Sequence, residues 1–159
     1  MMWFIKNKIE SIVLSFIKMK YPFVKWGEKI KIYGYPLLQF HKNADIYIGD
    51  HVILQSKAAD NMVGLFKKCS IYVGANAKFC INNFSGMSGV SIYCVNNIYI
   101  GKFVNIGGNV CIWDTNFHPI YSEDRRVHNI SKIKTAPIYI HDDVFIGANS
   151  IILKGVTIG

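Results

Sequence analysis

An aliphatic residue followed by glycine recurs along this sequence, and over long stretches its period is six residues. Each pair begins a six-residue unit, such as IGDHVI, IGKFVN, IGGNVC or IGANSI, with a small or β-branched residue usually at the fifth position. The period continues without a gap through residues 88–113 and again through residues 134–159. A repeat of this length constrains the fold strongly, because one small structural unit must be used again and again. The repeat is marked by the pairs Ile48-Gly49, Val73-Gly74, Ile100-Gly101, Ile106-Gly107, Ile146-Gly147 and Ile158-Gly159.

A six-residue period indicates short parallel strands wound into triangular coils. Three units complete one coil, and stacked coils place the first-position aliphatics in one internal column, while glycine or asparagine eases the corners. An ordinary sandwich of short strands would not need aliphatic residues at a strict spacing of six. We therefore expect an all-β fold: a hexapeptide-repeat parallel β-helix at residues 41–159, preceded by an N-terminal helix and lead-in segment at residues 1–40.

The repeat is interrupted in two places. Val73 and Phe79 are in phase with Ser85, but the next series starts at Ser88, so a small irregularity lies in NNFSGMSG. Ile140 comes 28 positions after Ile112, four more than four units. The simplest interpretation is a loop at about residues 113–137 that leaves the coil and returns to it.

The N-terminal segment at residues 2–20 has the helical period instead. Its apolar stripe consists of Met2, Ile5, Ile9, Ile12, Phe16 and Met19. An amphipathic helix of this kind can pack against the rest of the chain or a neighbouring subunit. It can also make peripheral contact with an anionic membrane, helped by the lysines around it. Both alternatives stay open at this point.

Composition narrows the class of partner. The 159 residues are 51% hydrophobic, which suits one folded domain, and the net charge is +8. Such a charge favours an anionic partner, which could carry phosphate, an acidic sugar, anionic lipid or nucleic acid. No run approaches the roughly 18 apolar residues that span a bilayer, and we expect no signal peptide. The four cysteines show no CxxC spacing and are expected to be buried free thiols in a reducing compartment, the cytoplasm.

The loop and the repeat after it carry a family resemblance. The stretch DTNFHPI, followed by IYIHDDVFIGANSIILKGVTIG, resembles the sugar O-acetyltransferase branch of the hexapeptide-repeat acyltransferases, which includes the maltose and galactoside acetyltransferases. The resemblance covers about residues 40–159 and implies a left-handed β-helix and a homotrimer with active sites between subunits. It implies transfer of acetyl from acetyl-CoA to a sugar hydroxyl, in the synthesis of a capsule, O-antigen or exopolysaccharide. Neither a metal nor a nucleic-acid partner is expected.

His118 is the expected general base. In the enzymes of this branch a His-Pro pair on the protruding loop takes the proton from the acceptor hydroxyl, and His118-Pro119 matches it. The chemistry needs such a group because a sugar hydroxyl is a poor nucleophile near neutral pH, whereas a thioester carbonyl is already a good electrophile. A neutral imidazole, with a reference pKa near 6.5, suits that task.

Other residues receive roles from their position near the loop or from the resemblance. Asp114 and Asn116 could orient the His118 ring, contact the acceptor or simply hold the loop. Arg125 could bind an acidic sugar or CoA phosphates, or could lie on a solvated face. The resemblance places the oxyanion donor at the backbone N–H of Ala148.

Two further groups of residues are assigned to substrate contacts. The resemblance assigns the CoA surface to Phe145, Gly147, Ala148 and Lys154. Ser88 lies where these enzymes place a small polar residue that contacts the acceptor, with Ser85 and Asn83 as rivals because of the slip in register. A hydroxyl fitting a tight corner is the alternative for Ser88.

Two alternatives to the acetyltransferase hypothesis remain. Enzymes of this branch continue with further coils that cover CoA, whereas this sequence stops at Gly159, so we expect an incomplete CoA site and keep an inactive or scaffold protein as an alternative. A zinc enzyme of the carbonic anhydrase type would need three convergent histidines. His118, His128 and His141 lack the short-spaced pair of that type.

Overall fold

The chain forms one helix followed by a solenoid of short strands. The computed structural model describes the backbone of residues 2–159 and the side chains of residues 10–59 and 61–159. Helix α1 (Met2–Lys20) comes first. The first coil contains β1 (Lys25–Trp26), β2 (Lys31–Tyr33) and β3 (Leu37–Phe40). The second contains β4 (Asp45–Ile48), β5 (Ile53–Gln55), the short helix η1 (Ala58–Asp60) and β6 (Ser70–Val73).

The remaining coils are interrupted by a long excursion of the chain between the fourth coil and the fifth. The third coil contains β7 (Lys78–Ile81), β8 (Gly86–Ser88) and β9 (Ser91–Cys94), and the fourth β10 (Asn97–Ile100), β11 (Asn105–Ile106) and β12 (Cys111–Trp113). The short helices α2 (Ser122–Arg126) and η2 (Ile130–Lys132) follow. The fifth coil contains β13 (Ile138–Ile140), β14 (Phe145–Ile146) and β15 (Ile151–Leu153), and β16 (Thr157–Ile158) begins the next.

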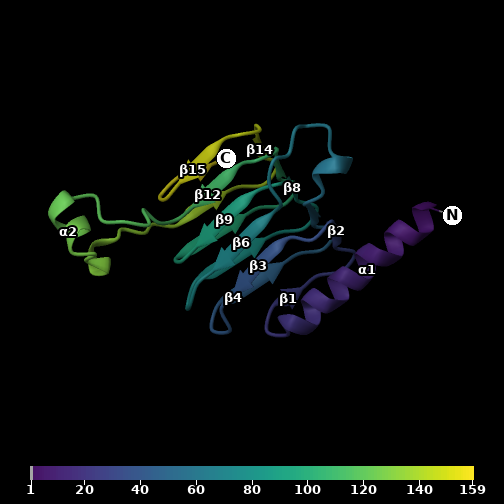
Figure 1. Cartoon of the computed structure of the whole chain (residues 1–159), viewed down its shortest axis with the longest axis horizontal. Helices are drawn as coiled ribbons and strands as arrows, with labels where there is room; N and C mark the ends of the chain where they lie inside the picture. The colour runs from purple at the N-terminus through teal and green to yellow at the C-terminus, as the bar shows by residue number, and fades with distance from the viewer. Residues whose placement is uncertain (1) are drawn as a thin grey trace.

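Every third strand joins the same parallel sheet, which makes the solenoid a triangular prism (Figure 1). Sheet A has the order β1-β4-β7-β10-β13-β16, sheet B the order β2-β5-β8-β11-β14, and sheet C the order β3-β6-β9-β12-β15. All the strand pairs are parallel. The expected left-handed parallel β-helix with an N-terminal helix is confirmed.

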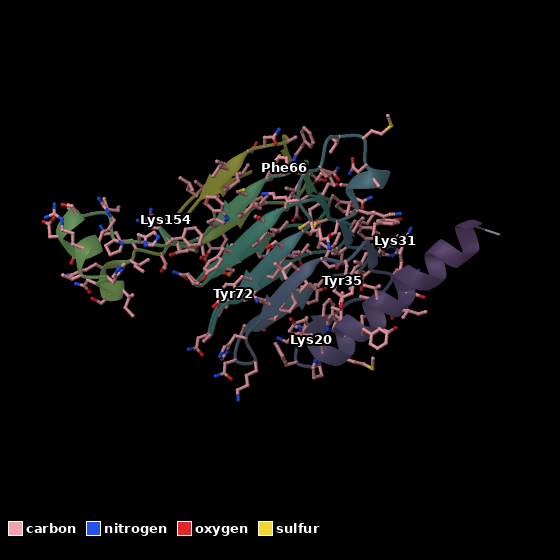
Figure 2. The ribbon with its side chains drawn as sticks, viewed as in Figure 1. Lys20, Lys31, Tyr35, Phe66, Tyr72 and Lys154 are labelled. Carbon is pink, nitrogen blue, oxygen red and sulfur yellow. The ribbon has the colours of Figure 1, made fainter. Side chains whose placement is uncertain are left out.

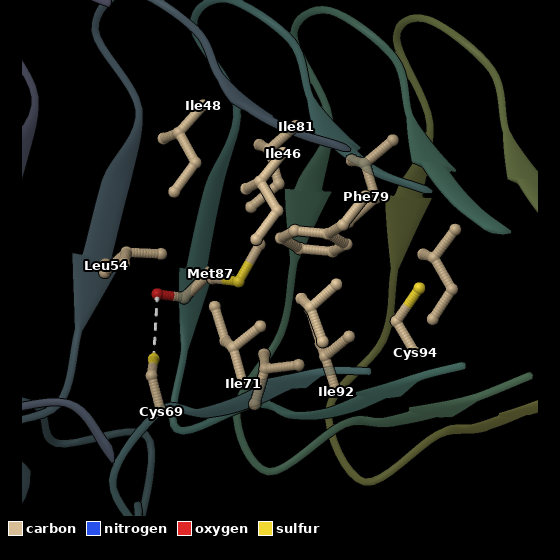
Figure 3. Packing of buried hydrophobic residues seen from close by; sticks show 14 of the residues in the cluster. Ile46, Ile48, Leu54, Cys69, Ile71, Phe79, Ile81, Met87, Ile92 and Cys94 are labelled. Atoms are coloured by element: carbon tan, nitrogen blue, oxygen red, sulfur yellow. Dashed lines mark hydrogen bonds between the residues drawn. The ribbon is translucent and has the colours of Figure 1, made fainter. Parts of the chain in front are cut away.

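The core is a column of aliphatic side chains, as the six-residue period predicts. Ile48, Ile81, Ile100 and Ile140 pair in register across adjacent strands of sheet A, and all four are fully buried. Met87, from sheet B, and Phe79, from sheet A, fill the space between the sheets (Figure 3). Buried parallel strands need apolar residues that fill the same position in each coil, so the packing of the core explains the six-residue repeat.

Ile100→Ala tests this column. We expect the substitution to lower the free energy of unfolding by about 3–4 kcal/mol, because it leaves a cavity between two isoleucines that cannot collapse onto it. Urea denaturation followed by circular dichroism measures the change. The matched control is Ile151→Ala on sheet C, where the side chain is exposed and a change within about 0.5 kcal/mol is expected. Equal losses of unfolding free energy at the two sites would contradict the buried column of aliphatic side chains.

The β-helix begins earlier than residue 41. Strands β1 and β2 lie within residues 25–40, which the sequence assigned to a lead-in segment, and they pair with β4 and β5. The correct spacing of six is present at Trp26, Ile32 and Leu38. None of them forms an aliphatic-glycine pair, because the two aliphatic residues are not followed by glycine and the residue that is, Trp26, is aromatic. The first coil was therefore not predicted, because its first position holds an aromatic residue in place of an aliphatic one.

The slip in register lies at Ser88, and the expected phase there is wrong by one residue. Met87, and not Ser88, points into the core, because it pairs with Leu54 and Ile106. The next inward residue is Ile92, only five positions later. Gly89 adopts a left-handed φ of 55° at this corner, and a side chain there would meet the Lys67 carbonyl, so glycine permits the shortened turn.

The four cysteines are free thiols. Cys69 and Cys94 are buried in the core, and Cys80 and Cys111 are half-buried. Burial raises the pKa of the Cys69 and Cys94 thiols, and it raises the pKa of Cys80 to about 11. These three thiols therefore stay protonated at neutral pH. The expectation of buried free thiols is confirmed for Cys69 and Cys94, whereas Cys80 and Cys111 are only half-buried.

Helix α1 covers the first coil with a face that the sequence did not predict. Val13, Leu14 and Ile17 pack against the core, whereas Phe16 and Met19 of the expected stripe are exposed. The expectation that this stripe packs against the rest of the chain is therefore wrong for its described members. The other members, Met2, Ile5 and Ile9, lie outside the described side chains. Among the described residues no helix has the length and apolar character needed to cross a bilayer.

Candidate functional site

A long arm, residues 115–137, leaves the prism after β12 and returns at β13, close to the loop bounds expected from the sequence (Figure 1). Its two limbs are joined at the base. Thr115 and Thr135 form an antiparallel bridge, and the Asn116 N–H donates to the Lys134 carbonyl at 3.1 Å. The base of the arm is therefore fixed by backbone hydrogen bonds, while α2 and η2 lie at its far end.

Asp114 anchors the arm to the coil below. Its carboxylate is fully buried and accepts the backbone N–H groups of Val95, at 2.9 Å, and Asn96, at 2.7 Å. Its own carbonyl accepts the N–H of Ala136 at 3.1 Å on the returning limb. Within the described residues no hydrogen bond joins Asp114 to His118. This geometry favours a role for Asp114 in holding the loop over one in orienting the imidazole.

The Asp114 carboxylate also affects the titration of the neighbouring Cys94 thiol. Asp114 comes directly after β12, and Cys94 is the last residue of β9, the neighbouring strand in the coil below. The Asp114 carboxylate therefore lies next to the Cys94 thiol. Burial, with the Asp114 charge as a second cause, raises the pKa of the Cys94 thiol. A buried carboxylate in an apolar column is tolerated because backbone N–H groups satisfy it.

The turn that carries His118 is tight and partly anchored. The His118 N–H donates to the Asn116 carbonyl at 2.7 Å, and Phe117 between them has a φ of 60°, the pattern of a γ-turn. The Phe117 ring packs edge-on against Tyr93 and Trp113, with centroids 4.8 and 5.5 Å away. The backbone that leads into His118 is therefore held by this hydrogen bond and by the packing of the Phe117 ring.

The imidazole of His118 is the exposed group of this turn. Pro119, the next residue, is buried, whereas the His118 side chain is exposed and makes no hydrogen bond to any described residue. A neutral imidazole in this position keeps a free nitrogen lone pair to accept a proton. The turn thus presents an available base on a fixed backbone.

Asn116 carries an unsatisfied donor beside this histidine. Its Nδ2 atom is buried and has no hydrogen-bond partner among the described residues. A buried N–H without an acceptor costs about 1–3 kcal/mol. An acceptor from outside the described chain would remove that cost, which makes Asn116 a candidate for contact with a ligand or a second copy of the chain.

Arg125 lies at the far end of the arm and serves its local structure. Its Nη1 donates to the carbonyl of Pro119 at 3.2 Å and also to that of Ile120. These contacts brace the segment that follows His118. Part of the guanidinium is therefore used within the arm, and the exposed remainder is free to face an anion.

A second group of expected site residues lies on another edge of the prism. Gly147 and Ala148 form the corner between β14 and β15, and the neighbouring Phe145 is 75% exposed. The Ala148 N–H has no acceptor among the described residues. His118 leaves from the edge between sheets C and A, whereas these residues lie at the edge between sheets B and C. One chain therefore does not bring the base and the expected oxyanion donor together.

Ser88 belongs to this second group. Together with Phe145, Ile53 and Asn105 it lines a concavity of about 370 Å³ on sheet B. Its hydroxyl accepts a hydrogen bond from the Asn61 side chain at 3.3 Å. A mostly apolar concavity that carries two polar side chains and an exposed aromatic ring is an arrangement that can hold a ligand.

Lys154 lies on the same edge as the arm. It is in the turn between β15 and β16, which joins sheet C to sheet A one coil beyond the arm. Figure 2 places it near the base of the arm. Lys154 therefore groups with His118 and not with Phe145, Gly147 and Ala148, although the resemblance assigned it to their surface.

The sequence missed a second excursion at residues 57–69. Leu54 and Ile71 hold equivalent inward positions but are 17 residues apart, where a regular corner takes six. Asn61 reaches Ser88, and Asn109 anchors the loop by accepting the Phe66 N–H at 3.2 Å and donating to the Gly64 carbonyl at 3.0 Å. The available signal was Val63-Gly64, an aliphatic-glycine pair that lies 15 residues after Ile48 and 10 before Val73 and is therefore out of phase with both.

Within the described side chains no three His, Cys, Asp or Glu residues converge on a metal site. Comparison of the chain with models of protein families, with curated proteins and with solved structures finds no match.

Proposed function

We propose that the protein is an O-acetyltransferase that moves acetyl from acetyl-CoA to a sugar hydroxyl, with His118 as general base. The observation that carries the proposal is the exposed imidazole, free of hydrogen bonds to the described residues, on an arm whose base is fixed to a rigid solenoid. Catalytic groups gain most when a stiff scaffold positions them and water or substrate can still reach them.

The proposed step is a direct transfer in which atoms and protons balance. The acceptor hydroxyl oxygen attacks the thioester carbonyl carbon while the His118 imidazole takes the hydroxyl proton. The tetrahedral intermediate then breaks its carbon–sulfur bond, and the leaving thiolate takes that proton from the imidazolium. The products are the sugar acetyl ester and free CoA, and no acyl-enzyme forms.

The two groups of site residues suggest that one active site uses two copies of the chain. His118 and Ala148 lie on different edges of the prism, so the arm of one copy must reach the corner of another for both to contact one substrate. A closed ring of three copies satisfies this requirement with three equivalent sites, and we propose a homotrimer. The exposed Ala148 N–H then serves as the oxyanion donor.

The remaining contacts fit the same site. Phe145 offers an exposed ring, Gly147 leaves room beside it, and Lys154 supplies a cation for the phosphates of CoA. The Asn116 amide would gain the acceptor that it lacks by donating to the sugar. A surface polysaccharide or its precursor is the proposed acceptor, and Arg125 is available for an acidic sugar.

Mixed oligomers test the proposal of a shared site. His118→Ala removes the base, and Ala148→Pro removes the oxyanion donor, so each homogeneous variant should be nearly inactive. An equal mixture, co-expressed or refolded together, should recover about one quarter of the wild-type rate, because one site in four takes both intact residues from different chains. Acetyl-CoA consumption, measured by chromatography with a panel of sugars, gives the rate.

The control is a mixture of two His118→Ala preparations with different tags, which should stay inactive. Each variant must first match the wild-type melting temperature, because proline at position 148 can disturb the corner. Two folded, inactive variants that do not complement each other would rule out the shared site. Wild-type protein without CoA binding or turnover would rule out the acetyltransferase function itself.

A further inference from the structure

Helix α1 has two apolar faces, and the prism uses only one of them. Val13, Leu14 and Ile17 pack against the core, with Ile17 only 5% exposed. On another side of the same helix, Ile12, Phe16 and Met19 are 48, 60 and 66% exposed. The spacing of these three residues, four and then three, places them on one stripe of the helix.

The exposed stripe is unusual for a helix that already covers a core. A soluble surface helix places polar residues on the side away from the core. Here the outward side carries isoleucine, phenylalanine and methionine, and all three side chains are exposed. Figure 1 shows α1 lying along the outside of the first coil, which leaves its outward side open.

The surroundings of this stripe are strongly basic. Residues 1–31 contain seven lysines and two glutamates, which makes five positive charges in excess. Two of these lysines also make contacts within the chain: Lys25 pairs with Asp45 at 2.9 Å, and Lys18 donates to the Gly27 carbonyl at 3.4 Å. Lys18 and Lys20 lie in the last turn of α1, and Lys20 and Lys31 both project near the helix in Figure 2. A helix with an apolar stripe and flanking lysines has the composition of segments that lie in the interface of an anionic bilayer.

We propose that the outward face of α1 docks the protein onto a membrane surface that contains anionic lipids, with Ile12, Phe16 and Met19 entering the boundary between headgroups and acyl chains. The lysines around the stripe contact the lipid phosphates, each contributing about 1 kcal/mol near the surface. The helix lies in the plane of the interface and does not cross it. This attachment is independent of acetyl transfer by His118.

A second copy of the chain fits this face less well. The three exposed side chains can bury on the order of 300 Å², whereas a stable interface needs about 800 Å² from each partner. A symmetric contact would also bring two lysine-rich segments together, and like charges repel. An anionic bilayer avoids both problems, because it complements the charge and has no minimum area.

Vesicle binding of the full chain tests the proposal. Wild-type protein should sediment with phosphatidylcholine vesicles that contain about one third phosphatidylglycerol, and molar salt or pure phosphatidylcholine should weaken the binding. Phe16→Ser should weaken partitioning by about five- to tenfold, and the triple variant Ile12→Ser, Phe16→Ser, Met19→Ser should abolish it. The melting temperature of each variant is measured first.

Phe66→Ser is the matched control, because Phe66 is 76% exposed on the 57–69 loop and lies outside α1. It should bind vesicles as the wild type does. The proposal is overturned if Phe16→Ser binds with unchanged affinity, or if wild-type protein binds neutral and anionic vesicles equally or not at all. A triple variant that changes the sedimentation mass and not vesicle binding would assign the face to a second copy instead. If the triple variant does not fold, Phe16→Ser alone decides.

Discussion

His118→Ala is expected to lower kcat for acetyl transfer by about 10³-fold, because a positioned general base contributes roughly 10²–10⁴ to such a rate. The side chain is exposed and bonds to no described residue, so the melting temperature should not change. KM for acetyl-CoA should stay close to the wild-type value, since the imidazole acts on the acceptor proton. Steady-state kinetics with a sugar that the wild type acetylates measures both constants.

His128→Ala is the matched control for this experiment. His128 is also an exposed histidine of the arm, in the segment after α2, and its N–H donates to the Arg125 carbonyl. Its side chain has no proposed role in the transfer, so kcat should stay within about twofold of the wild type. Equal losses of kcat in the two variants would mean that any substitution in the arm lowers activity. An unchanged kcat in His118→Ala would exclude His118 as the base.

Asp114→Ala is expected to lower the free energy of unfolding by about 3 kcal/mol, because it leaves the N–H groups of Val95 and Asn96 buried without their acceptor. It should also lower kcat by about tenfold, since the arm loses its attachment to the coil below and His118 becomes less well positioned. Chemical denaturation gives the first value and steady-state kinetics the second.

Asp142→Ala separates the buried anchor from an ordinary corner contact. Asp142 is exposed, and its carboxylate accepts the Lys102 N–H at 2.7 Å. Its loss should cost about 1 kcal/mol or less and leave kcat unchanged, because water can replace the acceptor. Asp114→Asn, which keeps one acceptor oxygen, should fall between the two. Asp114→Ala with full stability and full activity would contradict the proposed role.

The repeat predicted the fold because its physical cause is local. Each first-position aliphatic residue, such as Ile100 or Ile140, must fill the same buried position in its coil, so a period of six residues is visible without any long-range information. The same logic located the arm, since a loop that leaves the coil interrupts the period. It failed for the first coil, where Trp26 takes the place of an aliphatic residue.

The candidate site was predictable only in part. His118 could be found because a His-Pro pair falls where the period stops. The burial of Asp114, its bonds to Val95 and Asn96, and the unpaired amide of Asn116 depend on residues of other coils that the sequence does not pair. The 57–69 loop was missed, although the 17-residue spacing from Leu54 to Ile71 exceeds the six residues of a regular corner.

The sequence by itself determined the solenoid, its hydrophobic column and the place where the arm leaves, since all three follow from a short-range period. Only the tertiary structure decided which side of α1 covers the core, which way the Asp114 carboxylate points, and that His118 and Ala148 lie on different edges of the prism. The physical reason is that a period fixes which residues share a face. Contacts between one coil and the next, and between the helix and the first coil, decide which of those faces are covered.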